Sequence, residues 1–504
     1  MTVENNETPQ GSAPRPNTDP TFDARRDKAE RLRARAIDPY PARVRRSHAN
    51  RALQEAFFGL EPGQVSETTA DVTGRVLSIR NRGAFIDIYD GTGKMQLFID
   101  LKAISDETRL VLDHLDLGDF VGASGIVRRT PRGELTVNIA TLSLIAKALR
   151  TPPEKYHGVT DVELRYRKRY LDFIANEESR QKILTRSRLI SATRRFLEGR
   201  GFVEVETPML HPIYGGAAAR PFRTHHNTLD MDLFLRIAPE LYLKRLIVGG
   251  VSDRVYEINR NFRNEGISTR HNPEFTMLEL YQAYADWEDM LNLLEDLIGT
   301  VMMDSTGATT ATIEDQTVSF ARPFRRISMV ESASRASGID FRAETDLESL
   351  RAKVQATLGH KVPDDTNWGQ LVELVFEERV EASMIEATHV VDFPSDISPL
   401  SKRSPEDPRI AERFETYCFG IEIANAFSEM NDPVLQRSIF EEQVRAAHAA
   451  GEPDKQLDED FLEALECAMP PTGGLGLGID RLAMIATGSR SIREVIAFPT
   501  VRPV

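Results

Sequence analysis

Apolar and polar residues alternate between residues 71 and 147, a pattern typical of half-buried β-strands. The alternation predicts strands at 72–80, 85–89, 95–99, 120–127 and 135–139, with a short helix near 110–115. Three strands, a helix and two strands is the order of an OB-fold, a small barrel that binds oligonucleotides. Such a barrel can also be a protein-interaction module, so the fold alone does not decide the function.

Beyond a charged connector with Pro152 and Pro153, the apolar period lengthens to that of a helix. Ile183, Ile190 and Leu197 recur every seven residues and predict a long amphipathic helix, followed by a strand at 202–206. The remaining sequence mixes strand and helix patterns without strict βαβ alternation. We therefore expect an α+β domain built on an antiparallel sheet with flanking helices, carrying a helical insertion at roughly 335–385.

Composition changes this picture at two places. The 504 residues carry a net charge of −14, which excludes a uniformly basic nucleic-acid coat. Residues 24–46, however, hold nine Lys or Arg and three acids, so this arm is either a solvated helix face or a phosphate-facing segment. Two cysteines exclude a disulfide framework, and no long apolar run or secretion signal is apparent, so we expect a cytoplasmic protein without membrane association.

Charged residues occur within strand-like sequence between 255 and 281. We expect a hairpin that brings five residues onto neighbouring positions of one sheet: Arg263, Glu265, His271, Phe275 and Glu279. A guanidinium group suits phosphate, and a phenyl ring offers a flat face for a base. An exposed, ion-paired hairpin is the alternative interpretation.

A second charged segment, residues 412–429, interleaves acids with apolar positions of predicted strands. Carboxylate oxygens at this density suit Mg²⁺ held jointly by protein and substrate phosphates. The solvent face of an edge strand would have the same pattern. A third segment is glycine-rich, from Gly473 to Ile479, and we expect a loop there that approaches a ligand, with Arg481 at the following helix start.

Common catalytic motifs are missing from the sequence. It has no phosphate-binding G-x-x-x-x-G-K-[ST] loop, no G-x-G-x-x-G before a helix, no H-E-x-x-H and no G-x-S-x-G. What remains is a combination of separated arginines, an aromatic ring, carboxylates and an upstream barrel.

These residues resemble the class II aminoacyl-tRNA synthetases, and most closely the lysyl-tRNA synthetase family within that class. The helix and strand ending at Pro208 look like motif 1, Arg263 to Phe275 like motif 2, and Gly476 to Arg481 like motif 3. Longer strings at 214–222, 236–244 and 260–281 carry the assignment to the lysine family. The resemblance extends from about Arg25 to Pro503.

The resemblance implies a domain organisation. We expect a disordered tail at 1–22, an N-terminal helical arm at 23–66, an anticodon-binding OB domain at 67–150 and a class II catalytic domain at 151–504. It also implies a homodimer, with tRNA(Lys), ATP and L-lysine as partners.

The resemblance further implies roles for individual residues. Arg263 and Arg481 would be catalytic and hold the α- and γ-phosphates of ATP. The remaining ATP contacts would come from Glu265, His271, Phe275 and Glu415. Lysine would be bound by Gly216, Glu240, Glu279, Tyr281, Asn425 and Glu429. Glu415 and Glu422 would ligate Mg²⁺, about two or three ions per site, and Phe85, Gln96 and Glu134 would read anticodon bases.

The implied reaction is the ATP-dependent activation of lysine to lysyl-adenylate, followed by transfer to tRNA. Because the lysine carboxylate is already a nucleophile, no Ser/His/Asp arrangement is needed. Three alternatives stay open at this point: a synthetase for aspartate or asparagine, a related protein that lysylates a protein, and a non-catalytic RNA-binding relative. Arginines in place of Glu240, Glu279 and Glu429 would be expected for an anionic side chain.

Overall fold

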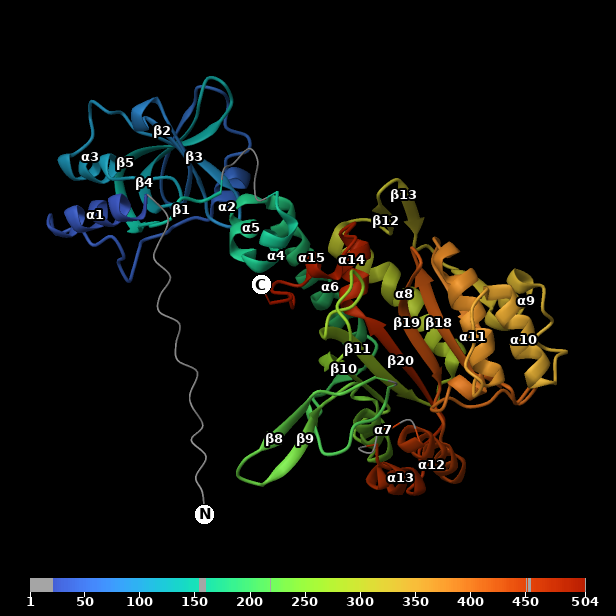
Figure 1. Ribbon diagram of the computed structural model, residues 1–504. Helices are drawn as coiled ribbons and strands as arrows, with labels where there is room; N and C mark the ends of the chain where they lie inside the picture. The colour runs from blue at the N-terminus through green and yellow to red at the C-terminus, as the bar shows by residue number, and fades with distance from the viewer. Residues whose placement is uncertain (1–20, 154–159, 218, 450, 452–454, 504) are drawn as a thin grey trace, which may run out of the picture. The chain divides into compact units, whose positions relative to one another are not determined.

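The computed structural model describes residues 21–153, 160–217, 219–449, 451 and 455–503. Residues 1–20 of the expected disordered tail lie outside this range, whereas Phe22 is the first residue of a helix. The chain forms two compact units: a barrel unit (residues 1–165 and 170–176) and a sheet unit (166–169 and 177–504). Each unit is described by itself (Figure 1).

Five strands of the barrel unit close into a barrel in the order β1-β2-β3-β5-β4. Their bounds are β1 (Val65–Arg80), β2 (Phe85–Tyr89), β3 (Lys94–Phe98), β4 (Phe120–Arg129) and β5 (Leu135–Ala146). The helices are α1 (Phe22–Arg33), α2 (Asn50–Ala56) and α3 (Asp106–Asp113). This arrangement confirms the predicted OB-fold.

Several cations of the basic arm form hydrogen bonds or ion pairs within the barrel unit. Arg25 is buried and donates to the carbonyl oxygens of Leu117 and Ala148. Lys28 pairs with Asp116 at 2.7 Å. These contacts favour a packing role for the part of the arm in α1.

The sheet unit is built around an eight-stranded, mostly antiparallel sheet, which confirms the predicted α+β class. In spatial order the strands are β14 (Arg325–Ser328), β15 (Thr388–Val391), β18 (Arg413–Cys418), β19 (Ile421–Ser428), β20 (Thr472–Gly478), β11 (Glu274–Ala283), β10 (Arg254–Phe262) and β6 (Val203–Glu204). Only the pairs β14–β15 and β10–β6 are parallel.

Helices pack on both faces of this sheet. Those of the main body are α6 (Glu177–Glu198), α7 (Glu240–Val248), α8 (Trp287–Thr306), α12 (Pro433–Ala449), α13 (Glu459–Glu466), α14 (Ile479–Ala486) and α15 (Ile492–Val495). Leu294 and Ile298 of α8 pack in one core with Leu475 and Leu477 of β20. The opposite face of β20 is left for the cavity described below.

The remaining elements are peripheral. Between β14 and β15 lie α9 (Met329–Ser337), α10 (Leu347–Leu358) and α11 (Trp368–Arg379), which share a core of their own, at the place of the predicted insertion. Small sheets pair β12 (Thr310–Ile313) with β13 (Gln316–Ser319), β16 (Phe393–Pro394) with β17 (Ile410–Ala411), and β7 (Leu210–His211) with β9 (Met231–Leu235) and β8 (Arg223–His226). Short helices α4 (Val162–Arg167) and α5 (Arg169–Ala175) lie where the chain passes between the units.

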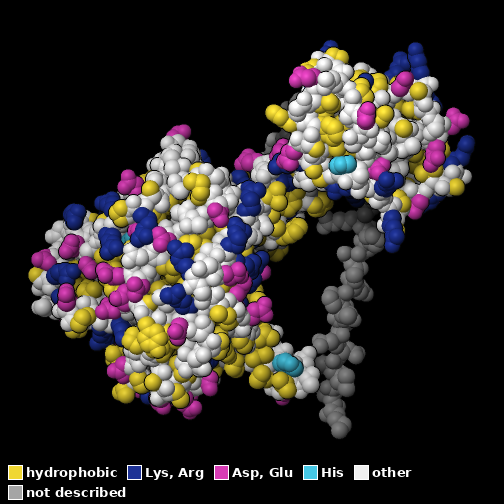
Figure 2. Space-filling model, turned by 180° about the vertical axis from the view of Figure 1, so that it is seen from behind, with side chains coloured by type: hydrophobic (Ala, Val, Ile, Leu, Met, Phe, Trp, Pro, Cys, Tyr) yellow, Lys and Arg dark blue, Asp and Glu magenta, His cyan; other side chains and the backbone are white. Residues whose placement is uncertain are grey.

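The surface of the sheet unit carries both signs of charge. Figure 2 shows Lys and Arg side chains interspersed with Asp and Glu over the visible face. Within the described residues, no helix is both long and apolar enough to span a bilayer.

Candidate active site

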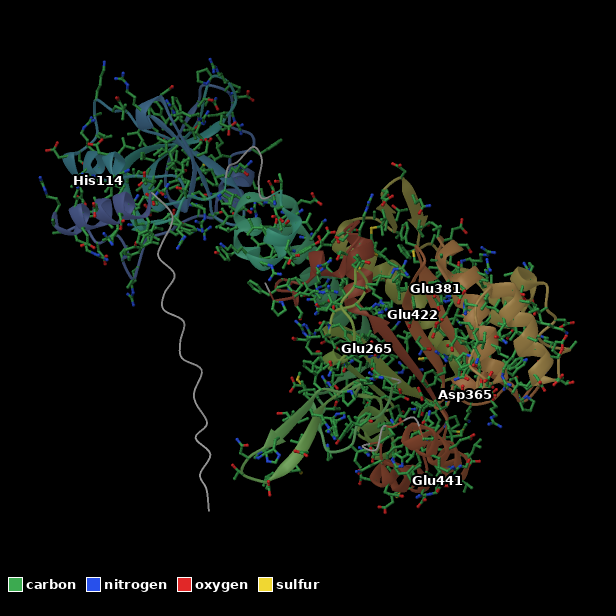
Figure 3. The ribbon with its side chains drawn as sticks, in the orientation of Figure 1. His114, Glu265, Asp365, Glu381, Glu422 and Glu441 are labelled. Carbon is green, nitrogen blue, oxygen red and sulfur yellow. The ribbon has the colours of Figure 1, made fainter. Side chains whose placement is uncertain are left out.

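Every proposed ATP- or lysine-binding residue except Glu415 lines one cavity of about 360 Å³ in the sheet unit. The cavity lies over β10, β11, β19 and β20 and is closed at one side by the start of α7. It brings together Gly216, Glu240, Arg263, Glu265, His271, Phe275, Glu279, Tyr281, Glu422, Asn425, Glu429 and Arg481. Figure 3 shows Glu422 between Glu265 and Glu381, in agreement with the two cavities that these residues line.

The expected hairpin differs from the structure in one respect. Phe275 and Glu279 lie on β11, but Arg263, Glu265 and His271 lie in the loop between β10 and β11. The Arg263 N–H still donates to the Pro273 carbonyl at 2.9 Å, but beyond it the chain forms a loop that lines the cavity instead of continuing the sheet.

The glycine-rich segment is a central strand, and the expectation of a loop was wrong. β20 pairs with β11 on one side and β19 on the other, so both of its neighbours supply ladder hydrogen bonds. Leu475 and Leu477 point into the core, and Gly474, Gly476 and Gly478 fall on the other face. The sheet therefore has a trough, a strip without side chains, along the cavity face of β20.

The trough gives space to the groups beside it. A Cβ at position 474 would lie 1.8 Å from Oε1 of Glu429 and 2.7 Å from Cε1 of Tyr281. At Gly476, in register with Glu279 and Asn425, the nearest atom is the flexible end of Met277 at 3.2 Å. The glycines thus allow side chains from neighbouring strands to reach the same floor.

Three buried carboxylates meet at one end of the cavity: Glu240, Glu279 and Glu429. Burial, and then Glu240, raise the pKa of Glu279 to about 8. Burial also raises the pKa of Glu429, while Lys244 opposes this rise. Tyr281 donates to Glu279 at 3.3 Å. This end of the cavity is suited to a cationic group, because a cation would relieve the cost of buried negative charge.

A buried lysine at this end was not among the candidates. Lys244 Nζ lies 2.7 Å from Glu240 Oε1 and also contacts Glu429 Oε2. A signal was present in the sequence, since Glu240 and Lys244 are four residues apart in an otherwise apolar helical stretch. The partner Glu429 is far away in sequence and could not be inferred from that spacing.

The other end of the cavity is cationic. The Arg263 guanidinium lies 5.1 Å from the centroid of the Phe275 ring, and burial lowers its pKa. Arg481 donates to Oε2 of Glu422 at 2.8 Å, and its Nη2 lies 3.3 Å from Nε2 of His271. Burial, and then Arg481, lower the pKa of His271, which keeps this imidazole neutral beside the arginines. Two guanidinium groups and a ring thus line a site suited to a polyphosphate and a base.

Glu415 lines a neighbouring cavity of about 280 Å³, which it shares with Glu422, His271 and Arg481. Its carboxylate accepts from Tyr417 at 2.6 Å and from Arg413 at 2.5 Å, and burial raises its pKa to about 7. Among the described residues, no group of three or more His, Cys, Asp or Glu could hold a metal. Two carboxylates therefore fit a Mg²⁺ ion only if substrate phosphates complete its coordination.

Asp480 is a second residue that the sequence reasoning missed. It is buried, accepts the Thr276 backbone N–H at 2.7 Å and pairs with Arg186 at 2.8 Å. These contacts tie the first turn of α14 to β11 and α6 directly beside Arg481. Its position before that arginine was visible in the sequence, but its partners were not.

The predicted anticodon residues lie in the barrel unit. The rings of Phe85 and Phe98 are 5.1 Å apart, and Gln96 accepts from Thr136 at 3.0 Å. Glu134 lies in the turn between β4 and β5, where its backbone N–H donates to Thr130. Phe85 and Gln96 come from adjacent strands of the barrel.

The fold and the cavity agree with comparisons to known families. Residues 161–502 match the model for tRNA synthetases class II (D, K and N), and residues 70–145 match that for the OB-fold nucleic acid binding domain. The chain therefore belongs to the class II tRNA synthetases.

Its relatives narrow the family further. The chain is 53% identical over 481 residues to the lysine--tRNA ligase of Rhizobium meliloti (strain 1021), covering 95% of this chain and 96% of that one. It is 50% identical to the lysine--tRNA ligase of Pelotomaculum thermopropionicum (strain DSM 13744 / JCM 10971 / SI), covering 95% and 94%. Within its class, the chain is a member of the lysine--tRNA ligase family.

Proposed function

We propose that the cavity activates L-lysine with ATP, releasing pyrophosphate, and that the lysyl group then passes to the 3′ end of tRNA(Lys). One observation carries this proposal: three buried carboxylates lie at one end of a cavity whose other end holds Arg263 and Arg481. A zwitterionic amino acid with a second ammonium group complements the acidic end. A triphosphate complements the arginines.

At the phosphate end, Arg263 holds the α-phosphate and stabilises the charge that develops during in-line attack by the lysine carboxylate. Arg481 holds the γ-phosphate, Phe275 stacks on the adenine, and Glu265 and His271 position the nucleotide. Release of Glu422 from Arg481 accompanies this binding, because the two side chains pair with each other at 2.8 Å in the structure.

At the acidic end, Glu429 and Tyr281 receive the ε-ammonium of lysine. Gly216, Glu240 and Glu279 surround its α-ammonium, and Asn425 faces the carboxylate. The buried position of these groups supports the assignment, since an ammonium leaves water only if carboxylates are paired with it.

Glu415 and Glu422 hold Mg²⁺ together with the ATP phosphates, at about two or three ion positions. Such a metal would neutralise phosphate charge and help to orient the triphosphate. Glu415 accepts one hydrogen bond on each oxygen, from Arg413 and Tyr417, so each oxygen keeps a further lone pair for the metal.

The barrel reads the anticodon through Phe85, Gln96 and Glu134. A homodimer forms through the segment after α6, where exposed apolar side chains gather: Val203, Met209 and Leu210. The enzyme works in the cytoplasm, in keeping with Cys418 and Cys467 being free thiols.

ATP–pyrophosphate exchange with each protein amino acid in turn tests the proposal. We expect exchange with lysine alone, and we expect Glu429→Gln to lose most of it. Exchange driven by aspartate or asparagine would overturn the amino-acid assignment. Lysine activation without transfer to tRNA, but with transfer to a protein, would favour the protein-lysylating alternative, and absence of any exchange would favour a non-catalytic RNA-binding relative.

A further inference from the structure

Lys244 is an internal cation within the acidic end of the cavity. It lies one helical turn after Glu240 on α7 and is fully buried, at 0% exposure. Its ammonium contacts Glu240 and Glu429 and lies 5.7 Å from the centroid of the Phe427 ring. Burial lowers the pKa of Lys244, but the two carboxylates outweigh this effect and raise it, so the group stays charged.

The charges at this end can be counted. Glu240, Glu279 and Glu429 supply three negative charges when ionised, and Lys244 supplies one positive charge. The nearby Glu257 is paired with Arg236 at 2.8 Å and adds no net charge. A bound ammonium favours the ionised form of Glu279, and two negative charges then remain to face the two ammonium groups of a diamino acid.

Glu429 shows where the second cation belongs. Lys244 forms an ion pair with its Oε2, whereas Oε1 has no ion-pair partner among the described residues. Neither oxygen accepts a hydrogen bond there, although the residue is 0% exposed. Oε1 points to the trough at Gly474, on the cavity side. A buried carboxylate oxygen without a donor is costly unless a ligand supplies one.

We propose that Lys244 is a positioning residue that sets the specificity of the pocket. It holds Glu240 and Glu429 ionised and oriented. Once the bound ligand ionises Glu279 as well, two carboxylate charges that Lys244 does not balance select an amino acid with two ammonium groups. This inference rests on the proposed lysine site. It assigns to Lys244 a part of the selectivity for lysine that the three carboxylates do not provide alone.

Removal of the cation tests the inference. In Lys244→Met, Glu429 loses its partner and takes up a proton, because a buried carboxylate without a cation is strongly disfavoured. We expect the KM for lysine in pyrophosphate exchange to rise roughly 100-fold, while the KM for ATP stays within about threefold of wild type. Inhibition by 6-hydroxynorleucine, a neutral counterpart of lysine, provides the second readout.

The neutral analogue distinguishes the loss of charge recognition from a general loosening of the pocket in the variant. If Lys244 maintains an ionised Glu429, the variant loses affinity for lysine but not for 6-hydroxynorleucine, and the preference for lysine falls at least tenfold. Equal weakening of both ligands, or a lysine KM within threefold of wild type in a folded variant, would overturn the inference.

Lys147→Met is the matched control. Lys147 is also fully buried and lies between two carboxylates, Asp116 and Asp119, but in the barrel unit. It should lower the melting temperature and leave both exchange KM values unchanged. The proposed lysine site and the role of Lys244 can fail separately. Unaltered lysine affinity in Glu429→Gln would contradict the lysine site itself. Reduced lysine affinity in Glu429→Gln together with normal lysine affinity in Lys244→Met would contradict only the role of Lys244.

Discussion

Gly474 determines the shape of the acidic end of the cavity through the side chain that it lacks. Glu429 Oε1 and the Tyr281 ring occupy the space into which a Cβ would project. Both groups are buried, so neither can move into solvent without breaking its surroundings. The position therefore controls two proposed lysine ligands at once.

Gly474→Ala should abolish most lysine activation without unfolding the protein. The added methyl group displaces Glu429 and Tyr281, and we expect kcat/KM for lysine in pyrophosphate exchange to fall by about 100-fold or more. Gly299→Ala in α8 is the control, because its Cβ would meet nothing closer than 3.5 Å and an alanine favours a helix. Normal lysine kinetics in Gly474→Ala would show that the cavity floor is not the lysine site.

Glu279 makes lysine binding dependent on pH. Its pKa of about 8 means that it is mostly protonated at pH 7, and a bound ammonium favours the ionised form. Binding therefore releases protons at pH 7, and the affinity for lysine rises as the pH increases toward 8. Calorimetric titrations in two buffers of different ionisation enthalpy measure this release.

The matched variant Glu279→Gln should reduce the number of protons released, since the titrating group is gone. A binding enthalpy that is the same in both buffers for the wild-type protein would contradict the raised pKa. Titration with lysine in the absence of ATP and Mg²⁺ keeps Glu415 out of the measurement.

At the scale of elements, the sequence predicts where a strand lies better than it predicts which other strands pair with it. The alternation near Glu279 and around Glu415 correctly indicates β11 and β18, because half-buried strands have a period of two. It does not indicate β20, whose glycines have no propensity for strands and whose pairing comes from β11 and β19 on both sides. Tertiary context overrides the local preference there.

The same limit applies to site residues. Arg263, Phe275 and Arg481 were predicted from residue type and motif, and the structure places them around one cavity; their roles stay predictions. Lys244 and Asp480 were not predicted, because a buried charge is recognised by its partners. Glu429, the partner of Lys244, and Thr276, the partner of Asp480, each lie more than 180 positions away in sequence. Spacing along the chain carries no information about such pairs.

Asp480→Asn should weaken both α14 and ATP binding. It removes the ion pair with Arg186 from a buried site, which costs about 3 kcal/mol of unfolding free energy. Because the first turn of α14 also carries Arg481, we expect the KM for ATP to rise at least tenfold. Denaturant unfolding and ATP-dependent exchange measure the two effects.

The control for this change is Asp286→Ala, which removes the capping box at the start of α8. It should cost about 1 kcal/mol and leave the KM for ATP unchanged. If both variants altered ATP binding in proportion to their loss of stability, Asp480 would have no specific influence on Arg481.

At the scale of the whole molecule, the two compact units divide the proposed tasks. All residues proposed for ATP and lysine lie in the sheet unit, and all those proposed for the anticodon lie in the barrel unit. The barrel was predictable from strand order alone, since each of its strands follows the last closely in sequence. The central sheet was not, because its neighbouring strands come from distant segments.

Phe85→Ala should separate the two tasks. The ring lies beside Phe98, whose own ring is covered by the Arg128 guanidinium at 4.4 Å, and loss of one stacking surface costs roughly 1–3 kcal/mol per base. We expect kcat/KM for tRNA aminoacylation to fall by roughly 5- to 150-fold while lysine-dependent exchange is unchanged. A parallel decrease in both activities would mean that the ring supports the fold instead of binding tRNA.

The place of β20 in the sheet also has a consequence for biosynthesis. This strand lies between β11 and β19, both of which are translated before it, β11 by almost 190 residues. Until it arrives, both neighbours present open edges that could pair with another nascent chain. The catalytic unit can therefore complete its centre only after β20 has been translated, and its newly made precursors are natural clients for chaperones.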